Sequence, residues 1–275
     1  MDTPAPPIQE PLRPPPAPVH WREALMEALG LGLFMVAAGG FGTLLESPAS
    51  PLQRTLGDAF VRRALMGLAM GATAVGLVYS PWGRRSGAHL NPAFTLILWR
   101  LGRVKGRDAV SYMLAQFAGG AAGVLLVAAF LKDAFLEPPV AAVATLPGPA
   151  GLTAAFLAEL GISFALVLMV LTLGAFQRLA RHTGLFVGAL LFLYITFEAP
   201  LSGMSMNPAR TLASALPLRD WRGLWIYFTA PPLGMLLAAA AHVRVARSKR
   251  AGCAKVVHSF PCIFCGGGAT PARPS

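Results

Sequence analysis

The amino-acid sequence predicts an all-α membrane protein, built as an inverted repeat from six transmembrane helices and two re-entrant half-helices. Three observations predict it: the composition, six long apolar stretches, and two short apolar runs that each begin at an Asn-Pro-Ala triplet. The chain has 275 residues, of which 55% are hydrophobic and 13% are charged, whereas soluble domains carry about 25% charged residues. Since so few polar residues cannot cover a soluble globule, we expect lipid to cover the outside.

Six stretches are apolar and near the roughly 20 residues needed to cross a bilayer: 23–45, 60–80, 109–131, 152–174, 184–201 and 223–246. Six spans put both termini on one side of the membrane. If that side is inner, the inner segments hold 16 of the 23 Lys and Arg, namely two in 1–22, six in 81–108, two in 175–183 and six in 244–275. This bias follows the positive-inside rule and explains the net charge of +11 without a nucleic-acid partner. We expect a multi-pass protein of the inner (plasma) membrane with both termini in the cytoplasm.

The two halves of the chain repeat one pattern. Each half opens with an apolar span that carries a glutamate inside it, Glu27 or Glu159, and later reaches an Asn-Pro-Ala triplet, 91–93 or 207–209. Because each half holds three spans, the second half enters the membrane from the opposite face, as in transport proteins whose site lies at the midplane between the repeats.

Each triplet opens a run of ten residues, 91–100 or 207–216, which Gly102 and Pro217 end. Ten helical residues rise about 15 Å, half of a hydrocarbon core about 30 Å thick, so two such helices from opposite faces would cross it together. Asn caps a helix with its side-chain oxygen and Pro suits the first turn, which leaves each Asn amide nitrogen to donate outward. We expect two positive helix ends to meet at the centre and repel cations.

The segments from Ser86 to Ala93 and from Ser202 to Arg210 resemble the two signatures of the aquaporin (major intrinsic protein) family, over residues about 22–246. The resemblance implies an aquaporin-like right-handed bundle, a homotetramer with one pore per subunit, and passive conduction of water and small neutral solutes without a cofactor. It identifies the pore motifs as Asn91, Pro92, Ala93, Asn207, Pro208 and Ala209. Its repeats would be 22–131 and 152–246, between a disordered Pro-rich arm, 1–21, and a cytoplasmic tail, 247–275.

The same resemblance gives roles to residues outside the triplets. Glu27 and Glu159 match paired glutamates that anchor the re-entrant loops. His89 matches a histidine at the cytoplasmic pore mouth, where we expect a structural role. Arg210 matches the arginine of the outer constriction, where a fixed guanidinium donates to passing oxygen atoms and repels cations.

Other constriction positions depart from the water-selective pattern. Ile195 stands where water channels carry a histidine, Met204 takes the loop position, and Gly71 replaces the aromatic residue of the second span, or Met70 if the alignment contains a gap. Thr211 replaces the aspartate of the glycerol facilitators. We expect a wider, more apolar constriction that admits glycerol, urea or neutral metalloid acids; the alternative, that compensating changes keep water the main substrate, stays open.

Three cysteines and a histidine lie close together in the tail: Cys253, His258, Cys262 and Cys265. Four soft ligands can bind zinc, but the spacing does not match the common finger patterns, so the sequence assigns no metal site. An unstructured tail, a metal site and a redox-active or palmitoylated patch all fit the residues.

Two other function classes are weighed against the channel. A coupled secondary transporter shares the inverted repeat and broken helices, but it needs a titratable group in the pathway, and Glu27 and Glu159 are better explained as anchors. A membrane enzyme needs a nucleophile with a base or a pair of carboxylates within the spans, and the sequence contains neither. We therefore expect no enzymatic activity.

Overall fold

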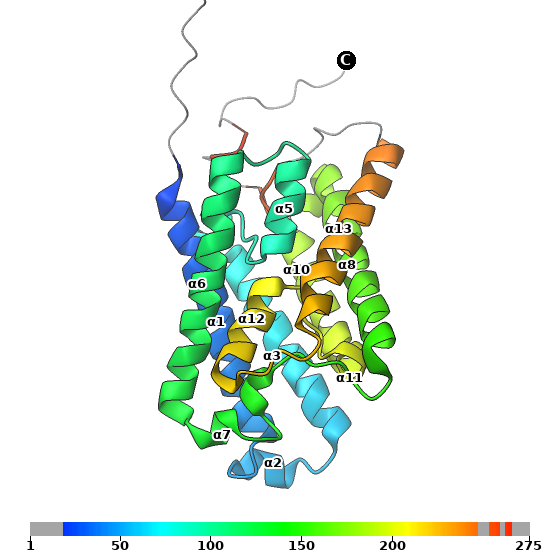
Figure 1. Cartoon of the computed structure of the whole chain (residues 1–275). Coiled ribbons are helices and arrows are strands. Elements are labelled where there is room, and N and C mark those ends of the chain that lie inside the picture. Colours follow the sequence, from blue (N-terminus) through cyan, green and yellow to red (C-terminus); the bar gives the residue numbers. More distant parts are fainter. Residues whose placement is uncertain (1–18, 247–252, 259–261, 266–275) are drawn as a thin grey trace, which may run out of the picture.

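The described residues of the computed structural model, 19–246, 253–258 and 262–265, form an all-α bundle without strands (Figure 1). Within them, six helices are long and apolar enough to cross a membrane: α1 (Trp21–Glu46), α3 (Ala59–Tyr79), α6 (Gly106–Leu131), α8 (Gly151–Ala175), the continuous run Thr183–Ser202, and α13 (Leu224–Ala246). That run consists of α10 (Thr183–Leu193), a π-helical turn η2 (Tyr194–Glu198) and α11 (Ala199–Ser202). Shorter helices connect them or enter the bundle: α2 (Pro51–Thr55), α4 (Pro81–Ser86), α5 (Pro92–Arg100), α7 (Asp133–Leu136), η1 (Ala141–Val143), α9 (Gln177–Ala180) and α12 (Pro208–Leu218).

The predicted fold class and all six predicted spans are confirmed, with ends that differ by a few residues. One predicted end is wrong: α12 continues through Pro217 to Leu218 instead of stopping before the proline. In the last turn a proline removes a single helical hydrogen bond, so the helix tolerates it. Of the predicted arm, residues 1–18 lie outside the described residues, as do 247–252, 259–261 and 266–275 of the tail.

The repeat is visible in how the long helices pair. In each half the first span packs along the third, α1 on α6 and α8 on α13. Glycines allow the close approach: a Cβ at Gly119 of α6 would lie 2.0 Å from the Ala28 carbonyl oxygen of α1, and one at Gly234 of α13 would lie 2.3 Å from that of Leu160 in α8. Small residues at such contacts are how membrane helices gain packing energy.

Polar and apolar side chains are distributed as a bilayer requires. Large apolar side chains cover the outside, with Leu25, Leu114 and Phe130 60%, 66% and 77% exposed. The carboxylates Glu27 and Glu159 are fully buried. A buried carboxylate in a membrane needs hydrogen-bond partners, so the polar groups of this bundle must satisfy one another inside it.

The half-helices α5 and α12 enter the middle of the bundle from opposite ends (Figure 1). Both are about half the length of a span, with 9 and 11 residues. They contact each other at their N-termini, which brings the two Asn-Pro-Ala triplets together.

Candidate functional site

The facing N-termini of α5 and α12 are capped in the same way. Asn91 and Asn207 have extended backbone, and a proline follows each in the first turn. The Asn91 Oδ1 accepts from the Ala93 N–H at 2.9 Å, and the Asn207 Oδ1 accepts from the Ala209 N–H at 3.0 Å. Both helices therefore begin at the triplet, with their N-terminal backbone donors directed at the bundle centre.

The two Asn side chains also connect the halves. The Asn91 Nδ2 donates to the Met206 carbonyl at 2.7 Å, and the Asn207 Nδ2 donates to the Leu90 carbonyl at 2.7 Å. We expected these nitrogens to donate outward from their own helices, and each makes one such donation to the loop of the other repeat. An amide NH₂ has two hydrogens, so each Asn keeps one beyond this bond.

The loop before each triplet has an unusual backbone that repeats between the halves. Left-handed φ angles recur at equivalent positions: Gly87 (105°), Ala88 (52°) and Leu90 (49°), then Gly203 (78°), Met204 (51°) and Met206 (54°). A residue with a side chain loses roughly 1–2 kcal/mol in this conformation. Interactions of the loop with the surrounding helices must therefore hold it in place.

Glu27 supplies those interactions for the first loop. Its Oε1 accepts from the Ser86 hydroxyl at 2.6 Å and from the His89 N–H at 3.0 Å. Its Oε2 accepts from the Leu90 N–H at 2.5 Å and from the Gln116 side-chain amide at 2.8 Å. Four donors thus satisfy one fully buried carboxylate, and two of them are N–H groups of the left-handed loop.

Glu159 does the same for the second loop. Its Oε1 accepts from the Ser202 hydroxyl at 2.9 Å and from the Ser205 N–H at 2.6 Å. Its Oε2 accepts from the Met206 N–H at 2.7 Å. The two glutamates therefore occupy equivalent places in the two repeats.

One tyrosine completes the attachment of each loop, and sequence reasoning missed both tyrosines. The Tyr112 hydroxyl of α6 donates to the Ser86 carbonyl at 2.9 Å, and the Tyr227 hydroxyl of α13 donates to the Ser202 carbonyl at 2.5 Å. Both tyrosines lie on the third span of their half. An alignment of the two halves of the chain would have detected the pair.

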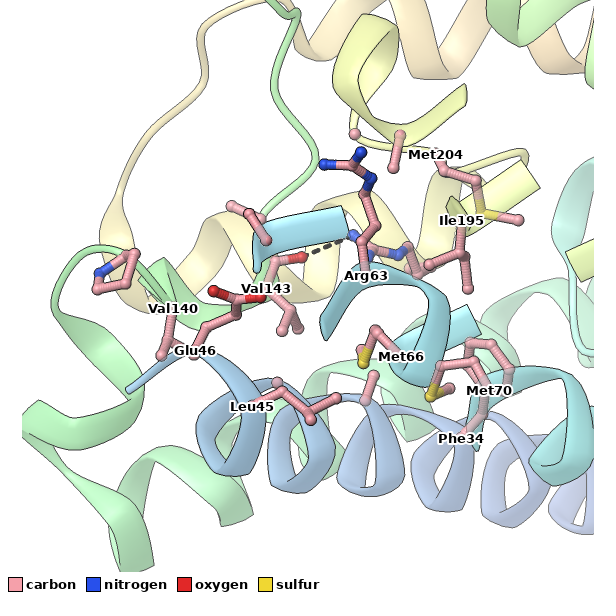
Figure 2. A pocket seen from close by; sticks show the side chains of 18 residues that line it. Phe34, Leu45, Glu46, Arg63, Met66, Met70, Val140, Val143, Ile195 and Met204 are labelled. Carbon is pink, nitrogen blue, oxygen red and sulfur yellow. Dashed lines mark hydrogen bonds between the residues drawn. The ribbon is translucent and has the colours of Figure 1, made fainter. Parts of the chain in front are cut away.

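A cavity of about 340 Å³ opens beside the first turn of α12, between α1, α3, η2 and the second loop. Figure 2 shows Phe34, Met70, Ile195 and Met204 around it, and Arg210 also lines it. Three of the four predicted constriction residues are therefore brought together, and Phe34 is an addition that the sequence did not suggest. We call this space the outer cavity.

Met70, and not Gly71, lines the outer cavity. Gly71 instead packs against α10, where a Cβ would stand 2.5 Å from the Gly188 carbonyl oxygen. Successive helical residues point about 100° apart, so α3 can direct only one of these two positions at the cavity. Of the two positions that the sequence left open, the cavity is therefore lined by Met70 and not by Gly71, and Met70 fills part of the space that a glycine would have left open.

Two arginines line the outer cavity. The Arg210 Nη1 donates to the Val143 carbonyl at 2.8 Å, which fixes its guanidinium against the segment before α8. The Arg63 Nε donates to the Thr196 carbonyl in the π-helical turn at 2.9 Å. Arg63 lies near the start of the second predicted span, where nothing in the sequence indicates that it lines a cavity.

Thr211, at the position of the facilitators' aspartate, does not line the outer cavity. Its hydroxyl lies 2.7 Å from the Thr145 hydroxyl and 2.5 Å from the Ser205 hydroxyl, and it is 2% exposed. The residue therefore connects α12 to the neighbouring segments.

His89 lies beside the C-terminal tail, whose described residues are at the end of the bundle opposite α2 and α7 (Figure 1). Its Nδ1 is 3.1 Å from the Thr95 hydroxyl, and its Nε2 is 3.0 Å from the carbonyl oxygen of Ala254 in the C-terminal tail. With Gly87 and Ala88, His89 forms what we call the inner mouth.

Comparison with known proteins agrees with this geometry. The profile described as "Major intrinsic protein" matches residues 17–242. The chain is 32% identical over 233 residues to aquaporin NIP6-1 of Arabidopsis thaliana, covering 84% of this chain and 71% of that protein. It is 30% identical over 230 residues to aquaporin Z of Photorhabdus laumondii, covering 77% and 93%. The X-ray structure of the aquaglyceroporin from Plasmodium falciparum shares the fold, with a TM-score of 0.66, 23% identity, and coverage of 82% and 96%. This chain, a multi-pass membrane protein, therefore belongs to the major intrinsic protein family.

Proposed function

We propose that this protein is a passive channel that conducts water and small uncharged solutes across a membrane and excludes protons and ions. The observation that carries the proposal is the meeting of two Asn-capped helix ends inside the bundle. Irregular backbone at membrane depth is tolerated where it lines a cavity, and both left-handed loops lead to these ends. Membership of the major intrinsic protein family supports the same function.

Charge exclusion follows from the direction of α5 and α12. Each N-terminus carries the equivalent of about half a positive charge, and both face the same point. A neutral solute can accept a hydrogen bond from an Asn amide, whereas a cation meets two positive ends and then the guanidinium of Arg210. In this proposal Glu27 and Glu159 anchor the loops, and His89 is structural.

Solute selectivity is proposed to lie in the outer cavity, at Arg210, Met204, Ile195 and Met70. Three sides of this constriction are apolar, and methionine side chains are flexible enough to fit solutes of different shape. Arg210 offers the guanidinium donors that hydroxyl oxygens accept. Such a lining suits glycerol, whose carbon chain can lie on the apolar side while its hydroxyls face the arginine.

Assembly and topology complete the proposal. We infer a homotetramer with one pore in each subunit, in the inner (plasma) membrane, with both termini in the cytoplasm. Native mass spectrometry in mild detergent should give four chains per particle. An antibody against an epitope tag added at the C-terminus should bind only in permeabilised cells.

Stopped-flow light scattering on proteoliposomes tests the channel directly. Liposomes with the protein should shrink faster than empty ones in a sucrose gradient, and should reswell faster in glycerol. The flux should rise linearly with solute concentration and persist after an uncoupler collapses the proton gradient. Flux that saturates and stops with the uncoupler would instead identify a coupled transporter.

The double substitution Met70→Phe with Ile195→His should make the channel more selective for water over glycerol. A ring and an imidazole would narrow the apolar side, so glycerol permeability should fall about tenfold or more, the scale of discrimination that excluding one small group gives a pocket. Water permeability should change far less. The same stopped-flow assay, with both solutes on one preparation, measures the ratio.

The matched control for this double substitution is Gly71→Phe. Its side chain would meet the Gly188 backbone, so this variant should fail to fold, whereas Met70→Phe should fold normally. Unchanged glycerol flux in a folded Met70→Phe and Ile195→His channel would contradict the proposed constriction.

A further inference from the structure

The C-terminal tail returns to the bundle and contacts the inner mouth. The Val256 N–H donates to the Gly87 carbonyl at 3.0 Å, and the Ala254 carbonyl lies 3.0 Å from the His89 Nε2. The Phe264 ring stacks on the His89 ring, with centroids 5.7 Å apart and planes within 16°. The tail thus bonds to the same loop that leads to Asn91.

The contact is extensive enough to cover the mouth. Four consecutive tail residues are at least nine-tenths buried: Ala254, Lys255, Val256 and Val257. Three of them, Ala254, Val256 and Val257, belong to the same buried cluster as Ala88 and Phe94. A cavity of only about 40 Å³ remains between the tail and α5, against about 340 Å³ for the outer cavity. The tail therefore fills the inner end of the pathway.

The described tail residues include four potential metal ligands whose side chains converge. The ligand atoms of Cys253, His258, Cys262 and Cys265 all lie within 4.8 Å of one another. The Cys253 and Cys262 sulfurs are 3.3 Å apart, and the His258 Nε2 is 3.2 Å from the Cys265 sulfur. The three cysteines form no disulfide.

These separations are close to those of a tetrahedral zinc site. Zinc bonds of about 2.3 Å to sulfur and 2.0–2.1 Å to nitrogen place neighbouring ligand atoms roughly 3.5–3.8 Å apart. Three cysteines and one histidine form a common structural zinc set, and soft thiolates disfavour calcium and magnesium. The sequence spacing alone did not assign the site, because it could not show that the four side chains converge.

The charge around the cluster also suits a thiolate-bound metal. Zinc with three thiolates and a neutral imidazole has a net charge of −1. Arg103, a basic residue, lines the same small cavity as Cys253 and His258. A basic group beside thiolates stabilises their charged form.

We propose that segments 253–258 and 262–265 form a zinc-binding plug that closes the inner mouth of the channel. Cys253 and His258 flank the buried residues 254–257, and Cys262 and Cys265 flank Phe264, so one metal ion ties together both parts that contact the mouth. Metal binding to such a segment adds directly to the free energy of its folded form. Zinc therefore favours the closed state, and its removal favours the open state.

Metal binding is tested on the full-length protein in detergent, purified under reducing conditions and stripped with a chelator. One zinc ion should bind per chain, and cobalt should give the visible absorption bands typical of tetrahedral thiolate coordination. His258→Ala and Cys262→Ser should each lower zinc affinity by about 100-fold or more, beyond the roughly 10–100-fold cost of losing only a ligand's hydrogen-bond partner. His182→Ala, a histidine outside the cluster, is the control and should bind normally. Absence of zinc uptake, or uptake that survives in both cluster variants, would overturn the metal site.

The plug is tested by water permeability, and this part rests on the proposed channel function. Since zinc would bind only the docked tail, free zinc at about 100 times its Kd shifts the ratio of closed to open forms by about 100-fold. Zinc on both sides of the liposome should therefore lower water flux, and a chelator should restore it. A chain ending at Gly252 should conduct faster and ignore zinc, and Phe264→Ala should bind zinc but close less well.

The outcomes separate the two proposals. A folded chain ending at Gly252 that conducts no water would overturn the channel function itself. A full-length protein that binds zinc but conducts as fast as the shortened chain, with and without the metal, would overturn the plug.

Discussion

Replacing Glu27 by alanine is expected to abolish transport and to remove most of the stability of the folded protein. The substitution leaves four buried donors without their acceptor, namely two loop N–H groups, the Ser86 hydroxyl and the Gln116 amide. Each buried unsatisfied donor costs about 1–3 kcal/mol, so the four together cost roughly 4–12 kcal/mol, comparable to the whole stability of many proteins at about 5–15 kcal/mol. The remaining folded fraction after heating, followed by size-exclusion chromatography in detergent, measures the loss.

Related variants make this result specific. Glu159→Ala removes the acceptor of three donors and should destabilise less than Glu27→Ala. Glu27→Gln keeps one oxygen acceptor and should fall between alanine and the parent. Asp220→Ala, which breaks a pair with Arg222 at the surface, should leave the melting unchanged. A Glu27→Ala protein that melts like the Asp220→Ala control would show that the loop does not depend on this anchor.

Replacing Arg210 by valine is expected to produce a channel that leaks protons or cations while still passing water. The guanidinium lies at the outer cavity and is fixed by the Val143 carbonyl. A unit charge about 6 Å from a passing cation, at an effective dielectric constant near 20, opposes it by about 3 kcal/mol, so the leak should rise by up to about 100-fold. A pH-sensitive dye inside proteoliposomes, with an imposed potential, reports the leak.

Two further substitutions test whether the cation barrier depends on the charge of Arg210 itself or on any positive charge in the outer cavity. Arg210→Lys keeps the charge, so it should remain tight to cations while its solute selectivity changes, because an ammonium group lacks the planar donor fork. Arg63→Val removes the other guanidinium that lines the same cavity, so comparing its leak with that of Arg210→Val shows which of the two charges opposes cations. A tight Arg210→Val channel, or an equal leak in Arg63→Val, would place the cation barrier elsewhere.

The spans and half-helices were predictable because each is encoded locally. A stretch near 20 apolar residues has few alternatives to crossing a bilayer, and Asn followed by Pro starts a helix through its own side chain and its own ring. The structure keeps both caps at the predicted residues, Asn91 and Asn207. The correspondence between Glu27 and Glu159 was likewise visible in the sequence, because acidic residues are rare inside apolar spans.

The partners of those residues were not predictable in the same way. The bonds from Asn91 to the Met206 carbonyl and from Asn207 to the Leu90 carbonyl join atoms that are more than a hundred residues apart in sequence. Backbone carbonyls exist at every position, so no residue type marks the one that accepts. Tyr112 and Tyr227 carry a weak signal, which appears only when the halves are aligned.

By itself, then, the sequence determined a membrane bundle with two half-helices meeting inside it, because apolar length and helix caps act through neighbouring residues. Only the tertiary structure decided which residues line the pathway. Met70 rather than Gly71 faces the outer cavity because the rotation of α3 is set by its contact with Gly188 in α10. The tail covers the inner mouth because three of its residues contact the first loop. Val256 bonds to the Gly87 carbonyl, and Ala254 and Phe264 contact the His89 ring. Such contacts depend on where distant segments meet, and local sequence does not encode that meeting.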